Sequence, residues 1–123
     1  MQVELVSHWN DLLATFPASA QDVYFKEEYV RLYETDTEKA YCIVCSEDEK
    51  KLLFPMLRRT FRFNGETYYD FETAYGYGGP VTNSEDDAFR ANALAALKEY
   101  CSKNGFVAGF VRFQPILQNQ EGF

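Results

Sequence analysis

The dipeptide Asn64-Gly65 constrains the fold of this chain more than any other feature. It lies between two β-rich segments, "RTFRF" and "ETYYDF", and Asn-Gly in that position is the sequence signature of a two-residue type I′ hairpin turn. Counting outward from the turn sets three cross-strand pairs: Phe63 with Glu66, Phe61 with Tyr68, and Arg59 with Asp70. The last pair joins opposite charges, so we expect an antiparallel hairpin in this register.

Further strands are expected on both sides of the hairpin. Residues 40–46, "AYCIVCS", are continuously apolar and precede a charged turn, which predicts a strand buried on both faces. Residues 52–59, "LLFPMLRR", then return as its partner, with Pro55 indicating a sheet edge or a bulge because proline has no backbone N–H. Residues 106–113, "FVAGFVRF", are almost continuously apolar and predict another buried strand, which follows a helix as in an α/β layer.

Three segments have helical spacing. The first begins at Ser7 as N-cap and ends at Pro17, and the second covers "VYFKEEYVRLYETD". The apolar side of the second helix is expected to hold Phe25, Tyr29, Leu32 and Tyr33. The third runs from about residue 85 to 103, where Ser84 and Asp87 resemble a capping box and Gly105 ends the helix. Its predicted buried stripe is Phe89, Ala93, Ala96, Leu97 and Tyr100.

These elements predict an α/β (α+β) fold: a mixed, mainly antiparallel sheet packed by two N-terminal helices and one long helix. With 123 residues, 46% of them apolar, the chain fits one domain over residues 1–123. Its net charge of −7 argues against DNA or another nucleic acid as partner. The basic stretch Arg58, Arg59 and Arg62 is either solvated sheet-edge charge or a contact for an anionic ligand.

The sequence also predicts where the protein acts. No apolar run reaches the ~18 residues that would indicate a membrane span, and the N-terminus has neither the basic nor the apolar region of a signal peptide. Three cysteines, without the density of a disulfide scaffold, fit a reducing compartment. We therefore expect a cytoplasmic protein.

Few residues qualify for metal or nucleophilic chemistry. Cys42 and Cys45 match C-x-x-C, but residues three apart on a strand point to opposite faces, so we expect them, like Cys101, to be buried structural cysteines. His8 is the only histidine and is expected at the surface or in a helix cap. No metal site is predicted. Asp70 and Glu72 stand at a strand end and either reach a ligand or, for Asp70, pair with Arg59.

The segment "YGYGGP", residues 75–80, connects the hairpin to the long helix. It matches neither of the standard glycine-rich phosphate motifs. Gly76, Gly78 and Gly79 permit positive φ or a close backbone approach, and Tyr75 and Tyr77 supply aromatic faces with polar tips. Two readings remain open: a structural corner, or a loop that lines a ligand site.

Two stretches carry a resemblance. "DFETAYGYGGPV", followed by a helix and then "FVAGFVRFQPIL", resembles the N-terminal half of the FemAB-like branch of the GNAT-related N-acyltransferases. That group has a Y-G-Y-G-G-P loop and an F-x-R-F-H-P type of strand end at about this separation. The residues that carry the resemblance are Tyr75 to Pro80, Phe110, Arg112, Phe113 and Pro115.

The resemblance implies a two-domain cytoplasmic transferase that moves an acyl or aminoacyl group onto an amine, as in peptidoglycan bridge synthesis. The present chain would be its N-terminal domain, truncated before a second GNAT-like half and inactive alone. By that resemblance Tyr75 and Tyr77 would stack on or hydrogen-bond to a peptidoglycan-precursor or other small acceptor. The amides of Gly76, Gly78 and Gly79 would meet an anionic or carbonyl group, and Arg112 would hold a carboxylate or phosphate.

The sequence departs from the family pattern in two ways. Gln114 stands where the pattern usually has His, and no R/Q-x-x-G-x-G/A pyrophosphate loop is present. We therefore expect no cofactor on this segment and name no catalytic residue, while acyl-CoA or aminoacyl-tRNA would serve the full-length enzyme as donor. The alternative is a stand-alone, non-catalytic binding or interaction module, whose sheet is completed by a partner or a second copy.

Overall fold

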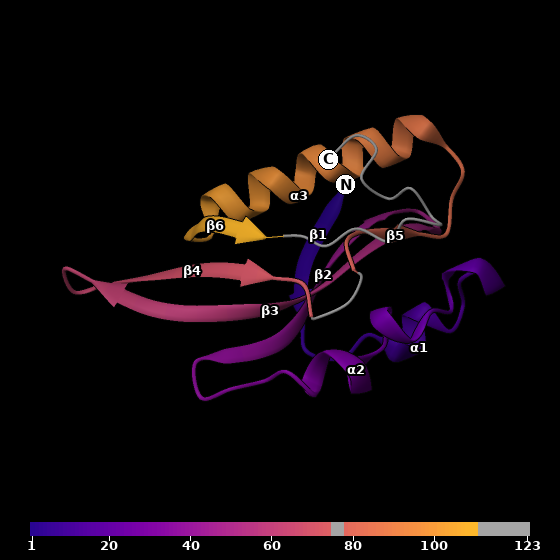
Figure 1. The fold of residues 1–123 in the computed structure, drawn as a ribbon. Coiled ribbons are helices and arrows are strands. Elements are labelled where there is room, and N and C mark those ends of the chain that lie inside the picture. The colour runs from indigo at the N-terminus through magenta and orange to yellow at the C-terminus, as the bar shows by residue number, and fades with distance from the viewer. Residues whose placement is uncertain (75–77, 111–123) are drawn as a thin grey trace.

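The computed structural model describes residues 1–74 and 78–110, which form one mixed sheet between two layers of helix (Figure 1). The strands are β1 (Gln2–Val6), β2 (Glu38–Glu47), β3 (Lys50–Phe63), β4 (Glu66–Glu72), β5 (Val81–Thr82) and β6 (Phe106–Phe110). The helices are α1 (Asn10–Leu13), α2 (Glu27–Arg31) and α3 (Asp87–Lys103), with short 3₁₀ turns at Ala18–Ala20 and Val23–Phe25. The predicted fold class is confirmed.

The sheet has the order β1-β2-β3-β4-β6, and β5 pairs with β3 beside this path. All pairs are antiparallel except β4 with β6, which is parallel. Parallel neighbours need a crossover, and α3 provides it between β4 and β6. In Figure 1 α3 covers one face of the sheet, and α1 and α2 lie on the other.

The hairpin prediction is confirmed in detail. Asn64 and Gly65 have φ of 53° and 80°, as a type I′ turn requires. The observed register contains all three predicted pairs: Phe63 with Glu66, Phe61 with Tyr68, and Arg59 with Asp70. The turn chemistry therefore determines which side chains of β3 face each side of the sheet.

Two buried clusters flank the sheet, one on each face. The predicted strand at residues 40–46 lies within β2, and its residues alternate between the clusters: Cys42 packs toward α1 and α2, and Cys45 packs toward α3. Pro55 of β3 pairs with Cys42 of β2. On the opposite side of β3, residues before Pro55 pair with β5 and residues after it pair with β4. Pro55 therefore lies at a local edge of the sheet among the described pairings. This matches one of the two expectations for Pro55.

The helix boundaries differ from the sequence prediction. Trp9, not Ser7, is the N-cap of α1, and Asp86, not Ser84, is the N-cap of α3, where its carboxylate accepts from the backbone N–H of Ala88 and Phe89 at 3.0 and 3.2 Å. Aspartate already satisfies both amides, so the capping box is not formed. The buried stripe of α3 is Phe89, Ala93, Leu94, Leu97 and Cys101, while Ala96 and Tyr100 are half-buried.

Two further expectations about burial were wrong. The second predicted helix is a 3₁₀ turn followed by the five-residue α2, which ends at Arg31; Leu32 after it is 75% exposed, and Val30 is buried instead. β6 is not buried on both faces over 106–109, since Val107 is 58% exposed and Ala108 and Gly109 are exposed. Residues 111–113 of the predicted strand lie outside the described residues.

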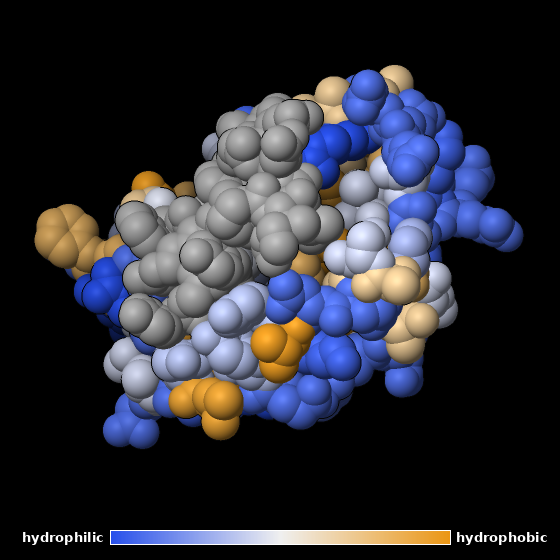
Figure 2. All heavy atoms as spheres, turned by 45° about the vertical axis from the view of Figure 1, so that its right-hand side comes forward, coloured by the Kyte–Doolittle hydropathy of each residue, from blue (hydrophilic) through white to orange (hydrophobic). Residues whose placement is uncertain are grey.

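On the face that Figure 2 presents, most of the described side chains are hydrophilic. Figure 2 shows only separate hydrophobic patches on the face it presents. Among the helices in residues 1–74 and 78–110, none is long and apolar enough to cross a bilayer.

The helices α1 and α2 cap each other. Both are too short to be stable alone, with four and five residues. The Glu27 carboxylate accepts from the backbone N–H of Trp9 and Asn10 at 2.9 and 2.7 Å, and the Asn10 side-chain oxygen accepts from the Glu27 N–H at 2.9 Å. Two short helices, joined by a link of thirteen residues (14–26), thus satisfy each other's orphan amides.

This arrangement changes the acidity of Glu27. Burial acts to raise its pKa, but the hydrogen bonds from Asn10, His8, Trp9 and Arg31 together lower it from 4.5 to about 2. Since the pKa in the folded state lies below the unfolded value, the ionised carboxylate stabilises the fold above pH 4.5. That contribution is lost as the pH falls toward about 2.

The Glu27→Gln variant should therefore be less stable at pH 7, with a free energy of unfolding lower by about 2 kcal/mol, because the charge-assisted bonds to its four partners are weakened. Its stability should also depend less on pH between 4.5 and 2. Urea unfolding across this pH range measures both effects. Glu4→Gln, which removes an exposed charge from β1, is the control and should change neither.

Candidate functional site

A row of polar side chains crosses the sheet at the C-terminal end of β4. The register aligns Glu38 of β2 with Arg59 of β3, Arg59 with Asp70 of β4, and Asp70 with Ala108 of β6. Residues aligned across neighbouring strands project from the same face, here the face that also carries α1 and α2. The hairpin register therefore brings together side chains from four strands.

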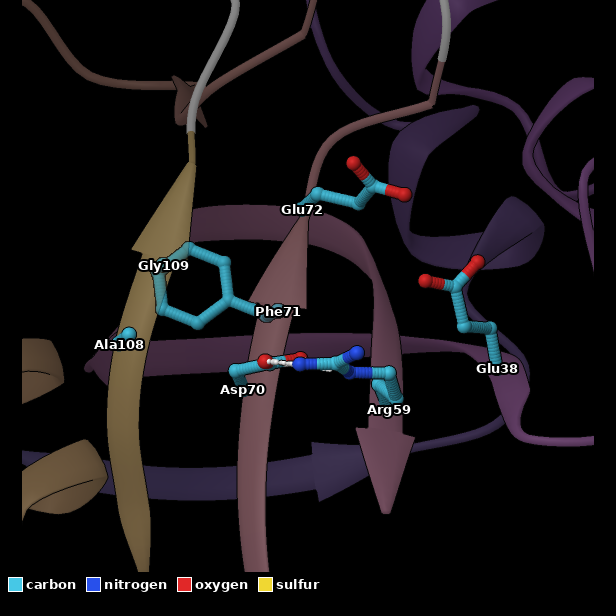
Figure 3. A pocket seen from close by; sticks show the side chains of 7 residues that line it. All are labelled: Glu38, Arg59, Asp70, Phe71, Glu72, Ala108 and Gly109. Carbon is cyan, nitrogen blue, oxygen red and sulfur yellow. Dashed lines mark hydrogen bonds and ion pairs between the residues drawn. The ribbon is translucent and has the colours of Figure 1, made fainter. Parts of the chain in front are cut away.

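This row borders an open cavity of about 310 Å³, which we call the acidic cavity (Figure 3). Its lining residues are Glu38, Arg59, Asp70, Phe71, Glu72, Ala108 and Gly109. In Figure 3 the carboxyl groups of Glu38 and Glu72 point toward one another, and the Arg59–Asp70 pair lies beside them. Three carboxyl groups thus share the cavity with one guanidinium.

Arg59 and Asp70 neutralise each other. Arg59 Nε donates to both carboxylate oxygens of Asp70, at 3.0 and 3.1 Å, and Nη2 donates to the second oxygen as well. The hydrogen bond and the charge of Asp70 raise the pKa of Arg59. The sequence left open whether Asp70 pairs or reaches a ligand, and the structure shows that it pairs while it also lines the cavity.

Glu38 and Glu72 remain as a carboxyl pair without a cation of their own. Burial raises the pKa of Glu38 above 4.5, and the charge of Glu72 and a hydrogen bond with it raise it further, while Arg59 acts in the opposite direction. The neighbouring carboxyl group of Glu72 thus favours the protonated form of Glu38. The pair can bind a cation when both groups are ionised.

The cavity wall depends on a close contact between Phe71 and Gly109. A Cβ on Gly109 would lie 2.2 Å from Cζ of the Phe71 ring, so only glycine permits this approach without movement. The ring also meets Phe54 and Phe106 at centroid distances of 5.4 and 6.0 Å. The wall is thereby anchored in the core on the α3 side of the sheet.

The glycine-rich loop begins three residues after Glu72. The predicted site residues Tyr75, Gly76 and Tyr77, and also Arg112, lie outside the described residues. Gly78 and Gly79 are described and buried, and Gly79 has a φ of 93°, a left-handed conformation that favours glycine. The structural need for glycine is therefore confirmed at Gly79, while a ligand role for this loop stays a prediction.

Sequence reasoning missed Glu38. Its place opposite Arg59 follows from the tight connection between β2 and β3, in which Asp48 has a φ of 55°. Asp at such a position is allowed but is a weaker signal than Asn-Gly, so the register of β2 could not be counted from the turn. Once that register is known, the position of Glu38 opposite Arg59 follows directly.

Other candidate groups do not form a reactive site. The cysteines are free and buried, and burial raises the pKa of Cys45 and of Cys101 to about 11. His8 is exposed, with Nδ1 2.9 Å from the Glu27 carboxylate. Across the described ranges, no three His, Cys, Asp or Glu side chains are arranged to hold a metal ion.

Gly109→Ala should lower the free energy of unfolding by about 1–3 kcal/mol, because the new methyl group must displace the Phe71 ring. The smaller side chain in Phe71→Leu should relieve this clash. The double variant should therefore lose less stability than the sum of the two single variants, as chemical denaturation would measure. Strictly additive losses would show that the ring does not make this contact.

Glu72→Gln should lower the pKa of Glu38, because the negative charge that helps to raise it is removed. Carboxyl ¹³C NMR titration measures this directly, and Glu85→Gln, an exposed change near the start of α3, serves as control. The folded-state pKa of Glu38 lies above 4.5, so its stabilising contribution is present below pH 4.5 and lost as the pH rises through the raised value. That loss should be smaller in Glu72→Gln.

Comparisons with known proteins do not identify a function for this site. No protein-family model, no curated protein and no solved structure matches the chain significantly. The resemblance to FemAB-like transferases therefore depends on the sequence motifs alone, and the chemistry of the acidic cavity depends on the geometry described above.

Proposed function

We propose that the chain is the N-terminal GNAT-like domain of a FemAB-like acyl or aminoacyltransferase, and that the acidic cavity contributes to binding of the acceptor amine. Two independent features support this. The Tyr-Gly loop and the strand end after residue 105 carry the family resemblance. The observation that carries the proposal for the cavity is its charge, since three carboxyl groups line it together with one guanidinium. One of the three, Glu72, lies three residues before that loop.

An amine acceptor is a cation at neutral pH, and the cavity suits one. Asp70 is occupied by Arg59, so Glu38 and Glu72 are the groups left to receive an ammonium ion. An ammonium ion between them would favour the ionised form of Glu38, against the effects that raise its pKa. Attack on an acyl group also requires the amine to lose a proton first.

The donor and its leaving group would be held by parts of the full-length enzyme beyond this cavity. Acyl-CoA or aminoacyl-tRNA are the donors that the family resemblance implies. The role proposed for this domain is therefore acceptor binding by Glu38, Glu72 and the Tyr75–Gly79 loop, with Arg112 as a further contact for an anionic group of the acceptor. No residue is assigned as the catalytic base.

A non-catalytic binding module is the second candidate. It is favoured by the exposed outer surface of β6, where Val107 is 58% exposed at the end of the described strand order. A C-terminal domain, a separate partner or a second copy of the chain would cover this strand. The transferase reading gains if the reading frame of the gene continues into a second GNAT-like domain.

A peptidoglycan stem peptide with a free lysine amine is the probe for this proposal, and the same peptide with that amine acetylated is its matched control. The free amine should bind more tightly at pH 7 in isothermal titration. Glu72→Gln should weaken its binding by about tenfold, the effect of losing one charge-assisted contact. Tyr77→Ala and Arg112→Ala should also weaken binding while the domain stays folded.

Glu66→Gln is the control variant, because it removes the same charge from the same strand, next to the hairpin turn and away from the cavity. It should leave binding unchanged. Equal binding of the free and acetylated peptides would contradict the proposal for the cavity. Loss of folding in Tyr77→Ala and Arg112→Ala would instead show that these residues have a structural role.

A further inference from the structure

The basic stretch at residues 58–62 is divided by the structure into three different environments. Arg59 is paired with Asp70 on the α2 side of the sheet. Arg62 donates from Nη2 to the carbonyl oxygen of Gly65 at 2.9 Å, across the hairpin turn. Arg58 forms no ion pair and no hydrogen bond within the described part of the chain. It is therefore the member of the stretch whose guanidinium has no oxygen acceptor among the described residues.

Arg58 projects from the face of the sheet that carries α3. Its neighbours Met56 and Phe54 on alternate positions of β3 belong to the cluster packed on α3, and β-strand side chains alternate between faces. The acidic cavity lies on the opposite face, next to Arg59. The two sites therefore lie on opposite faces of the sheet, although Phe71, the register partner of Arg58 on β4, also lines the acidic cavity.

Two tyrosines hold the Arg58 guanidinium in place. Its Cζ lies 4.3 Å from the ring centroid of Tyr41 on β2 and 4.3 Å from that of Tyr69 on β4. One ring comes from each neighbouring strand, so the guanidinium is flanked on both sides. Such cation–π contacts stabilise the charge but satisfy none of its N–H donors.

The donors of Arg58 are left without acceptors. Nε is fully buried and has no hydrogen-bond partner, which costs free energy that a structural arginine normally recovers. Nε is also the only side-chain nitrogen or oxygen of the described residues that is buried without a partner, so the Nη groups remain accessible to solvent. A guanidinium that is fixed in orientation and offers free Nη donors is prepared for bidentate contact with an oxyanion.

A second cation lies directly beside it. Lys39 of β2 is the register partner of Arg58, so both side chains project from the same face, and Lys39 is exposed. Like charges directly opposite on neighbouring strands are destabilising. An anion bound between them would remove this repulsion. Tyr100 of α3 lies close enough that the Arg58 charge affects its pKa, lowering it against the effect of burial.

We propose that Arg58 and Lys39 form a binding site for the phosphate group of a small phosphomonoester, with Tyr41 and Tyr69 as the walls that orient the guanidinium. Two adjacent cations match a phosphate dianion better than a carboxylate, which carries a single charge. A nucleic acid is a poor candidate, since the net charge of −7 repels an extended polyanion. The proposal goes beyond acceptor binding and does not depend on the acidic cavity.

NMR titration of the intact chain tests this site, with inorganic phosphate as the probe and acetate as the comparison anion at constant ionic strength. The Nε–H resonance of Arg58 reports on the site itself. Phosphate should shift it saturably and at lower concentration than acetate does. A linear, unsaturated response that chloride reproduces would overturn the proposal.

Matched variants separate this site from general electrostatics. Arg58→Gln should weaken phosphate binding by about tenfold or more, the effect of losing a bidentate charged contact, and Arg58→Lys should weaken it less. Arg62→Gln removes the same charge from the same strand and face, four residues away, and should leave the affinity unchanged. Equal losses in Arg58→Gln and Arg62→Gln would overturn the assignment.

Lys39→Gln gives a second independent test if Arg58→Gln does not fold. Lys39 is exposed, so its removal should leave the fold intact and weaken phosphate binding severalfold. The same variant should leave acetate binding nearly unchanged, because the second cation serves the second charge of phosphate. An unchanged phosphate affinity in Lys39→Gln would contradict the two-cation site.

Discussion

The register of β3 against its neighbouring strands is the constraint on which the rest of the structure depends. β3 is fourteen residues long and pairs with β2, β4 and β5. A slip of one residue would move every side chain of β3 to the other face of the sheet. It would exchange the apolar side chains of β3 between the two buried clusters, and it would separate Arg59 from Asp70. The type I′ turn at Asn64-Gly65 fixes one side of this register, and the buried β2 pairing fixes the other.

Much of this architecture follows from local sequence. The hairpin was predictable because Asn-Gly has few alternatives, and the two-faced burial of β2 was predictable because residues 40–46 are continuously apolar. The end of α3 was equally clear, since Gly105 takes up a φ of 81° directly after Asn104. In each case one residue type, or one periodicity, decides the outcome.

Long-range contacts decided the features that sequence reasoning missed. The N-terminus of α1 is capped by the Glu27 carboxylate, 17 to 18 residues away along the chain, so no local cap could have indicated its start. Leu32 is exposed because α2 ends before it, although its spacing is helical. Glu38 joins the candidate site through the β2–β3 pairing, which its turn sequence does not specify. Helical spacing and turn chemistry are local signals, and these features are not local.

The two faces of the sheet carry opposite charge at the same cross-strand position. Glu38 and Lys39 are consecutive on β2, and they pair with Arg59 and Arg58, which are consecutive on β3. On the α2 face the register places Arg59 between Glu38 and Asp70, and Glu72 adds a further carboxyl group, while on the α3 face it places two cations side by side. Both faces therefore contain a like-charge pair, Glu38 with Glu72 and Lys39 with Arg58, which opposes folding.

Strand alternation makes these two arrangements dependent on each other. Since Glu38 and Lys39 point to opposite faces of one strand, as do Arg58 and Arg59, a single register places all four, and no shift could relieve one face without disturbing the other. A chain selected for stability alone would place opposite charges across each strand pair. The unpaired Nε of Arg58 and the raised pKa of Glu38 are the two clearest departures from that rule in the described residues. Both lie where a bound ion of the opposite charge would remove the repulsion, which is the physical argument for the two proposed binding sites.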